Sequence, residues 1–267
     1  MPASARILRL VGASAVVVAA AAPGFVASNS ARHPCVNSDG AALASCFGFN
    51  STDATDTLHA AFAAEGLTHL TVDGVKGQPW LVRPLYLVNV SGLHVELAAG
   101  VTILAKQDEF HGLDDCLLRV TNVRDVVISG QPGSVLQMRR DDYAVPSRGS
   151  CPSCSAYKKA EWRMGIWLDG TATNVRLEEL HVTESGGDGL FVYGAKNTTV
   201  QDCVFDKHYR QGMSIISADG LLVERSTFAD TNGTAPEAGG LSSHKQIPAE
   251  SVHACCTVSL SSVHQRK

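Results

Sequence analysis

A repeat of 23 residues in the second half of the chain limits the possible folds more than any other feature. Three segments begin at Asn174, Asn197 and Gly220, each 23 residues after the one before, and carry apolar residues at the same places. Gly189 and Gly212 keep the same spacing. A fixed period of this size is typical of a solenoid, in which each repeat forms one coil and packs on its neighbours.

Apolar and polar residues alternate within each repeat, which indicates strands rather than helices. The equivalent apolar positions of the three repeats are Leu177, Val200 and Val223. We therefore predict an all-β fold, a single-stranded right-handed parallel β-helix, in which these three side chains are buried and stacked on successive coils. A chance repeat within a β-sandwich is the alternative.

The β-helix is expected to occupy residues 51–240, after a loose segment at 29–50. Thr52 and Asp53 can cap a short helix through about Ala64, and an amphipathic helix there would cover the open end of the solenoid.

Two later segments break the pattern. Residues 139–160 are polar and are expected to form a loop that projects from the coils. Residues 241–267 lose the periodicity and are expected to form a non-repetitive tail, either poorly ordered or an altered form of further coils.

The N-terminus has the features of a secretion signal, which we assign to residues 1–28. Arg6 and Arg9 precede an apolar run, Leu10–Ala22, and small residues near Ala27 could permit cleavage. An uncleaved membrane anchor is the alternative, but the run is short for a membrane span. We expect a secreted or extracellular protein with no stable membrane insertion after cleavage.

Eight cysteines in an exported chain suggest disulfides. Cys35 could pair with Cys46, although the sequence does not decide this. Cys151 and Cys154 form a CxxC motif that favours a loop disulfide over a metal site, and Cys203 is expected in the core. Four N-glycosylation sequons agree with secretion; they begin at Asn50, Asn89, Asn197 and Asn232.

The net charge is −4 and the chain has no block of basic residues, which argues against a nucleic-acid partner. We expect a monomer that acts on a polysaccharide.

Aligning the coils by their turn glycines brings charged side chains together. Asp188, in a glycine-flanked turn that a substrate could approach closely, would lie between Arg163 and Arg210 on the adjacent coils. Glu237 would lie beside Arg210 and two coils from Asp188, roughly 9–10 Å between Cα atoms. Carboxylates at such a separation can act as acid and base in glycoside hydrolysis.

The arginines leave other readings open. They could bind a uronate carboxylate or keep one acid ionised, or an arginine could abstract a proton as a lyase requires. The same residues could also be a charge ladder that only neutralises itself. The expected catalytic residues are Asp188, Arg210, Glu237 and Arg163.

Further residues could bind the substrate around this ladder. Trp162 could be a platform for the flat face of a sugar, whereas Trp167 is expected to pack in or on the coil. The other candidates could equally belong to ordinary solvated turns: Asp142, Tyr143, His208, Tyr209 and Gln211. No metal site is expected, because no pair of acids has a spacing that requires calcium.

Four motifs resemble a branch of the pectin-lyase-like right-handed parallel β-helix superfamily. They are Ala160-Glu-Trp-Arg163, Gly186-Gly-Asp-Gly189, Tyr209-Arg-Gln-Gly212 with Ile216-Ser-Ala218, and Thr231-Asn-Gly-Thr-Ala-Pro-Glu-Ala-Gly239. The resemblance covers about residues 47–239 and implies polysaccharide chemistry without fixing the reaction. The Asn-Thr-Asp, Asp-Asp and Gly-His-Gly motifs of polygalacturonases are missing.

The chain departs from similar proteins after Gly239, where a strand with acidic residues usually follows. The resemblance therefore implies either a secreted carbohydrate-active protein or a truncated, inactive copy of one. We expect hydrolysis of a polysaccharide, with eliminative cleavage second. A non-catalytic glycan-binding or cell-surface β-helix is the alternative. No cofactor is expected, although a lyase could use calcium.

Overall fold

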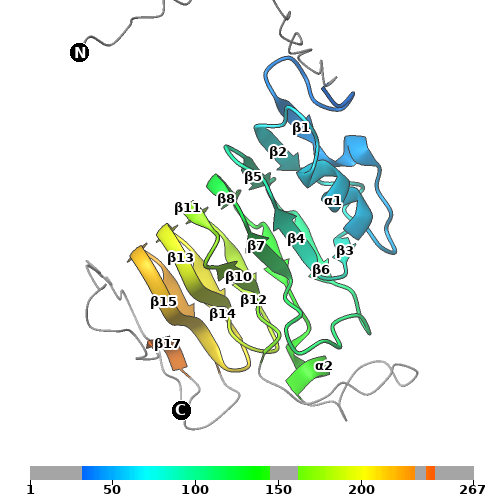
Figure 1. The fold of residues 1–267 in the computed structure, drawn as a ribbon. Helices are drawn as coiled ribbons and strands as arrows, with labels where there is room; N and C mark the ends of the chain where they lie inside the picture. The colour runs from blue at the N-terminus through cyan, green and yellow to red at the C-terminus, as the bar shows by residue number, and fades with distance from the viewer. Residues whose placement is uncertain (1–31, 145–161, 232–238, 244–267) are drawn as a thin grey trace, which may run out of the picture. The chain divides into compact units, whose positions relative to one another are not determined.

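The protein is a parallel β-helix built from three-sided coils (Figure 1). The computed structural model describes residues 32–144, 162–231 and 239–243. Neighbouring strands on every side of the coil pair in parallel.

Each side of the coil is a run of strands, one from each turn of the solenoid. The first side contains β4 (Leu85–Val88), β7 (Leu118–Thr121), β10 (Ile166–Asp169), the first halves of β13 (Leu190–Gln201) and β15 (Gln211–Glu224), and β17 (Gly239–Ser243). The second contains β1 (Ala41–Leu43), β2 (His69–Val72), β5 (His94–Leu97), β8 (Arg124–Gly130), β11 (Thr173–Glu178) and the second halves of β13 and β15. The third contains β3 (Trp80–Val82), β6 (Thr102–Ala105), β9 (Val135–Gln137), β12 (His181–Thr183), β14 (Val204–Asp206) and β16 (Thr227–Ala229).

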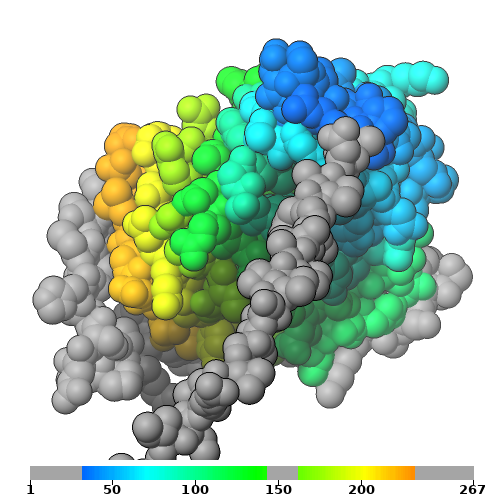
Figure 2. Space-filling model, turned by 45° about the horizontal axis from the view of Figure 1, so that its top comes forward, coloured from blue at the N-terminus to red at the C-terminus, as the bar shows by residue number. Residues whose placement is uncertain are grey.

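The observed register confirms the 23-residue repeat. Leu177 lies opposite Val200, and Val200 lies opposite Val223. All three side chains are buried in the main apolar core that runs through the coils. In the space-filling view the colours follow the sequence from blue to orange, as expected when each coil packs on the one before it (Figure 2).

The corners of the coil explain why it has three sides. Residues with positive φ recur at the same 23-residue offset: Asn174, Asn197 and Gly220; Glu179, Asp202 and Arg225; Glu184, Lys207 and Asp230. Each residue turns the chain sharply in the left-handed conformation, which asparagine, aspartate and glycine adopt at least cost. The three sets therefore mark three corners in every repeat.

The expected helix near the N-terminal end is confirmed as α1 (Thr55–Phe62). Its apolar face is buried, and Asp53 Oδ1 accepts a hydrogen bond of 3.1 Å from the backbone N–H of Thr55. Thr52 does not cap the helix: the N-cap residue is Ala54, and the N–H and hydroxyl of Thr52 both donate to Asn50. Asp53 also forms ion pairs with Arg83 and Lys106, which join the helix to neighbouring coils.

The β-structure extends beyond both expected boundaries. The segment 29–50 is not simply a loose lead-in, because β1 pairs with β2 and is followed by a short 3₁₀ helix, η1 (Ala44–Phe47). A disulfide joins Cys35 to Cys46, a pairing that the sequence had left open, with a Cα–Cα distance of 5.7 Å. At the other end β17 pairs in parallel with β15 as far as Ser243, three residues past the expected limit of 240.

Several predictions fall outside the described residues: the signal segment 1–28, the CxxC motif, and the tail from 244 onward. Cys203 is buried, as predicted. A second α-helix, α2 (Arg140–Ala144), occupies the start of the expected 139–160 loop. Within the part of the chain that the structure describes, no helix has the length and apolar character needed to cross a membrane.

Candidate functional site

The turn glycines align as the sequence predicted and bring Asp188 and Arg210 together. The N–H of Gly165 donates to Asp188 O at 2.8 Å, and that of Gly189 donates to Gln211 O at 2.9 Å. Arg210 Nε donates to Asp188 Oδ1 at 2.7 Å, and its Nη2 pairs with Oδ2. Contrary to expectation, Asp188 is not accessible in an open turn, because its side chain is completely buried.

Arg163 has a different role from the one predicted. It is completely buried and donates from Nε to Phe110 O and from Nη2 to His111 O, the latter at 3.1 Å. Within the described part of the chain Asp188 forms its ion pair with Arg210 and not with Arg163, so it is not held between the two arginines. Arg163 instead joins its coil to the loop after β6, because the carbonyl groups of that loop need buried donors.

Most of the predicted substrate-binding residues are also buried. Asp142, His208, Tyr209 and Gln211 all have less than a tenth of their surface exposed. Tyr143 lies in α2, but its side chain is outside the described residues, as is Glu237. The register of β17 places Gln211 opposite Gly239, so that Gly212 lies opposite Gly240 rather than opposite Gly239 as the sequence alignment assumed.

His208 belongs to the packing between coils. Its Nδ1 lies 2.8 Å from Ser185 Oγ, and its Nε2 lies against Gly189, where an added Cβ atom would be only 2.2 Å away. Burial lowers the pKa of His208 to about 3. The imidazole is therefore neutral near pH 7 and sealed from solvent.

The outer surface of the first side carries a cluster of aromatic residues that we call the aromatic face. In the strand register, Tyr86, Arg119, Trp167 and Phe191 form one row across β4, β7, β10 and β13. Tyr193 follows Phe191 two residues later on β13 and therefore points the same way. The aromatic face comprises Tyr86, Arg119, Trp162, Trp167, Phe191 and Tyr193.

The members of the aromatic face contact one another. The Trp167 and Phe191 ring centroids are 4.7 Å apart, and the Phe191 and Tyr193 rings are stacked at 6.4 Å. The Arg119 guanidinium lies 4.3 Å from the Trp167 ring centroid. Among these residues Tyr86, Trp162 and Tyr193 are exposed, with 43% of Trp162 and 53% of Tyr193 accessible to solvent.

Trp162 connects the aromatic face to the predicted charge pair. Its ring lies 6.1 Å from Phe191, and the Arg210 guanidinium lies 5.3 Å from its centroid. The structure thus brings together three residues that the sequence had singled out: Trp162, Arg210 and Asp188. Only Trp162 is substantially open to a ligand.

Asp169, at the end of β10, is an acidic group on this side that sequence reasoning missed. It accepts hydrogen bonds from the Thr121 hydroxyl at 2.7 Å and from the Thr171 N–H at 2.9 Å. Burial alone would raise the pKa of Asp169, but the hydrogen bonds from Thr171 and Thr121 outweigh it and hold the pKa below its usual value. Asp169 is therefore ionised, and it suits a base or an electrostatic stabiliser better than an acid.

The two carboxylates are too far apart to act as a pair. Asp188 lies opposite Met164, because Gly165 pairs with Gly189, and Met164 precedes Asp169 by five residues. At about 3.3 Å per residue, the two backbone positions are roughly 17 Å apart, against about 6.5–9.5 Å for inverting glycosidases. Within the described residues, no group of three or more His, Cys, Asp and Glu side chains could hold a metal ion.

Comparison with known proteins agrees with the fold. Residues 154–258 match the family model described as the right-handed β-helix region. A crystal structure of a "putative glycosyl hydrolase" from Parabacteroides merdae superposes with a TM-score of 0.56 at 16% identity, over 76% of this chain and 91% of that one. No curated protein matches the sequence significantly. The protein therefore has the right-handed parallel β-helix fold that the sequence predicted.

Proposed function

We propose that this is an exported, carbohydrate-active protein that binds a polysaccharide along the aromatic face and hydrolyses it. The observation that carries the proposal is the aromatic face itself. Exposed Trp162, Tyr86 and Tyr193 come from three different coils. Flat aromatic rings suit the apolar faces of sugar units, and successive coils offer a binding surface longer than one sugar.

The charged groups beside these rings support a polar ligand. Arg119 is packed on Trp167, and its interactions within the described chain include no ion pair. Its N–H groups are available to sugar hydroxyl or carboxylate oxygens. The likeness to the Parabacteroides merdae protein, whose name indicates a glycosyl hydrolase, points to the same class of ligand.

A second candidate, glycan binding without turnover, is favoured by the burial of Asp188. A carboxylate that is completely buried and held by Arg210 cannot reach a glycosidic oxygen. The roughly 17 Å between Asp169 and Asp188 also means that these two acids cannot act as a hydrolytic pair. Turnover would therefore need a further carboxylate, for which Glu237 is the candidate.

The deciding experiment is a screen of neutral and uronate-rich plant and algal polysaccharides. New reducing ends without unsaturated products would establish hydrolysis, whereas unsaturated products and a calcium requirement would establish a lyase. Retention of the protein on an insoluble glycan without either product would establish the binding function. If the protein neither cleaves nor is retained on any of the glycans tested, the proposal is overturned.

A further inference from the structure

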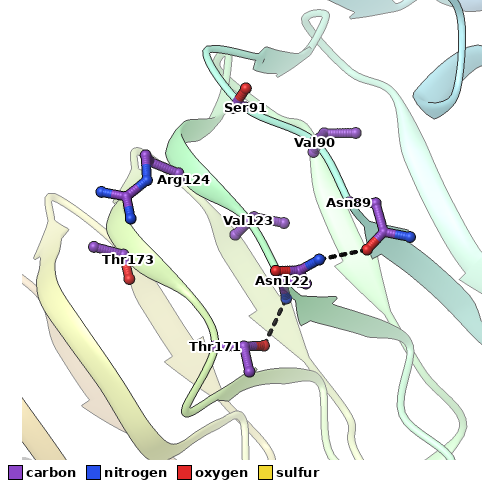
Figure 3. Close-up of a pocket in the computed structure, with 8 residues that line it drawn as sticks. All are labelled: Asn89, Val90, Ser91, Asn122, Val123, Arg124, Thr171 and Thr173. Carbon is purple, nitrogen blue, oxygen red and sulfur yellow. Dashed lines mark hydrogen bonds between the residues drawn. The ribbon is translucent and has the colours of Figure 1, made fainter. Parts of the chain in front are cut away.

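A polar pocket lies at a corner of the coil, at the end of the strands that carry the aromatic face. It has a volume of about 430 Å³, and its walls come from three successive coils. Its lining residues are Asn89, Val90, Ser91, Asn122, Val123, Arg124, Thr171 and Thr173. Figure 3 shows Asn122 in the middle of the lining, between Asn89 on one side and Arg124 with Thr173 on the other.

The pocket is built rather than accidental. The Asn122 amide donates to Asn89 Oδ1 at 2.6 Å, and the backbone N–H of Asn122 donates to the Thr171 hydroxyl at 2.6 Å (Figure 3). Thr171 is in turn hydrogen-bonded to Asp169 on the first side of the coil. These bonds fix the orientation of the two amides, and they join the pocket to the end of the aromatic face.

The unused groups of the lining are mainly donors. Within the described chain no side-chain hydrogen bond or ion pair engages Arg124, Ser91 or Thr173, and the amide nitrogen of Asn89 is also unengaged. None of the described residues that line the pocket is a carboxylate. The adjacent Asp125 accepts a hydrogen bond of 2.6 Å from Asn174.

The charge and the spread of these donors indicate the ligand. Arg124, Thr173 and Lys196 lie opposite one another on three coils, but Lys196 is not among the lining residues, so Arg124 is the cation of the described lining. A planar carboxylate is satisfied by one guanidinium fork, whereas a sulfate ester has three terminal oxygens that need donors on several sides. One cation with neutral donors from three coils suits a group of one negative charge and tetrahedral shape.

We infer that this pocket binds a sugar unit that carries a sulfate ester, as part of the same glycan that lies on the aromatic face. The inference rests on the proposed function for its setting, but it concerns separate residues. The volume accommodates one or two sugar rings, since ligand pockets of about 300–1,000 Å³ enclose small molecules. Val90 would contact the ring, and Arg124 would pair with the sulfate.

The test compares galactose 6-sulfate, galacturonate, galactose and inorganic sulfate as ligands, by saturation-transfer difference NMR. The protein is produced in a bacterial host, so that Asn89, which begins a sequon, carries no glycan. Galactose 6-sulfate should bind most tightly, and Arg124→Gln should weaken it by about tenfold or more, as expected for a hydrogen bond to a charged group. Ser91→Asp should weaken it as well, by placing a negative charge in the pocket.

Two control variants separate this inference from the proposed function. Arg225→Gln removes an exposed arginine that is paired with Asp202 and should change nothing. Trp162→Ala should weaken polysaccharide binding but leave galactose 6-sulfate binding intact. If Trp162→Ala weakens polysaccharide binding but Arg124→Gln leaves galactose 6-sulfate binding unchanged, the pocket inference is wrong and the aromatic face remains the binding surface. If Arg124→Gln weakens galactose 6-sulfate binding but Trp162→Ala leaves polysaccharide binding unchanged, only the proposed function is overturned.

Other outcomes also decide the matter. Equal binding of galactose would show that the charge is not recognised, and equal binding of galacturonate would show that a sulfate is not required. Binding of inorganic sulfate as tight as that of galactose 6-sulfate would show that the sugar ring is not recognised. Each of these results overturns the inference.

Discussion

Arg210 and Asp188 form a bidentate ion pair across adjacent coils, with the carboxylate completely buried and the guanidinium nearly so. A buried pair of this kind costs desolvation energy that its attraction only partly returns, but removing one partner leaves a buried charge behind. The pair therefore holds two coils in register, whatever it does in catalysis.

Asp188→Asn should destabilise the fold for this reason. We expect a loss of about 3–5 kcal/mol in the free energy of unfolding, measured by urea denaturation. Asp202→Asn, which breaks the exposed pair with Arg225, should change the stability much less, because solvent screens the charges of an exposed pair. If Asp188→Asn instead keeps wild-type stability and lowers turnover by about 10²–10⁴-fold, Asp188 acts as a general acid or base.

His208 should make the protein acid-sensitive. Its pKa is lowered to about 3 in the fold, against an ordinary value near 6.5, so below pH 6.5 the unfolded chain binds a proton that the folded chain does not. Stability from this group is complete above pH 6.5 and falls as the pH drops toward 3. Between pH 6.5 and 4.5 the loss should be about 2–3 kcal/mol, at about 1.36 kcal/mol for each pH unit.

The measurement is the slope of the free energy of unfolding against pH. A loss of stability that does not depend on pH leaves this slope unchanged, so the slope reports the titration alone. His208→Gln should flatten the slope in this range. An unaltered slope in His208→Gln would show that His208 does not cause the acid sensitivity.

Val200→Asp should unfold the repeat, because it places an unpaired charge between Leu177 and Val223 in the core. We expect a loss of more than about 3 kcal/mol by thermal or urea unfolding. Thr199→Asp is the matched control. Thr199 directly precedes Val200 and its side chain points out of the coil, so the substitution should cost less than about 1 kcal/mol. Similar melting of the two variants would contradict the assigned register.

The aromatic face should contribute directly to glycan binding. Trp162→Ala and Tyr193→Ala should each weaken binding to the glycan found in the screen by about fivefold, because each removes an exposed ring worth about 1 kcal/mol. Leu43→Ala removes an equally exposed apolar side chain elsewhere and should have no effect. Affinity electrophoresis in glycan-containing gels measures the binding of all three variants. If both aromatic variants are retarded as strongly as the wild type, the aromatic face is not the binding surface.

The disulfide between Cys35 and Cys46 should stabilise the N-terminal end. It closes a loop with a sequence separation of 11 residues, for which loop entropy gives about 2–3 kcal/mol. The double variant Cys35→Ala/Cys46→Ala should lose this amount in urea unfolding. A reductant should bring the wild type down to the same stability; a smaller effect would mean that the unfolded chain is already constrained there.

The sequence by itself determined the architecture of the repeats. A constant offset of 23 residues, combined with period-two alternation, leaves one register in which Leu177, Val200 and Val223 all face inward. The same offset places residues of left-handed conformation, such as Asn174 and Asn197, at the corners. These features are local and repeated, so each repeat carries the information for its own coil.

Tertiary structure decided which residues meet on the surface. Arg119 and Trp167 are neighbours in one row although 48 residues separate them, because the chain between their strands includes the long segment that begins with α2. Insertions of unequal length remove the constant offset, so the sequence could not align Tyr86 and Arg119 with Trp167. The burial of Asp188 was equally hidden, because exposure depends on the coils packed on both sides and not on the residue's own turn.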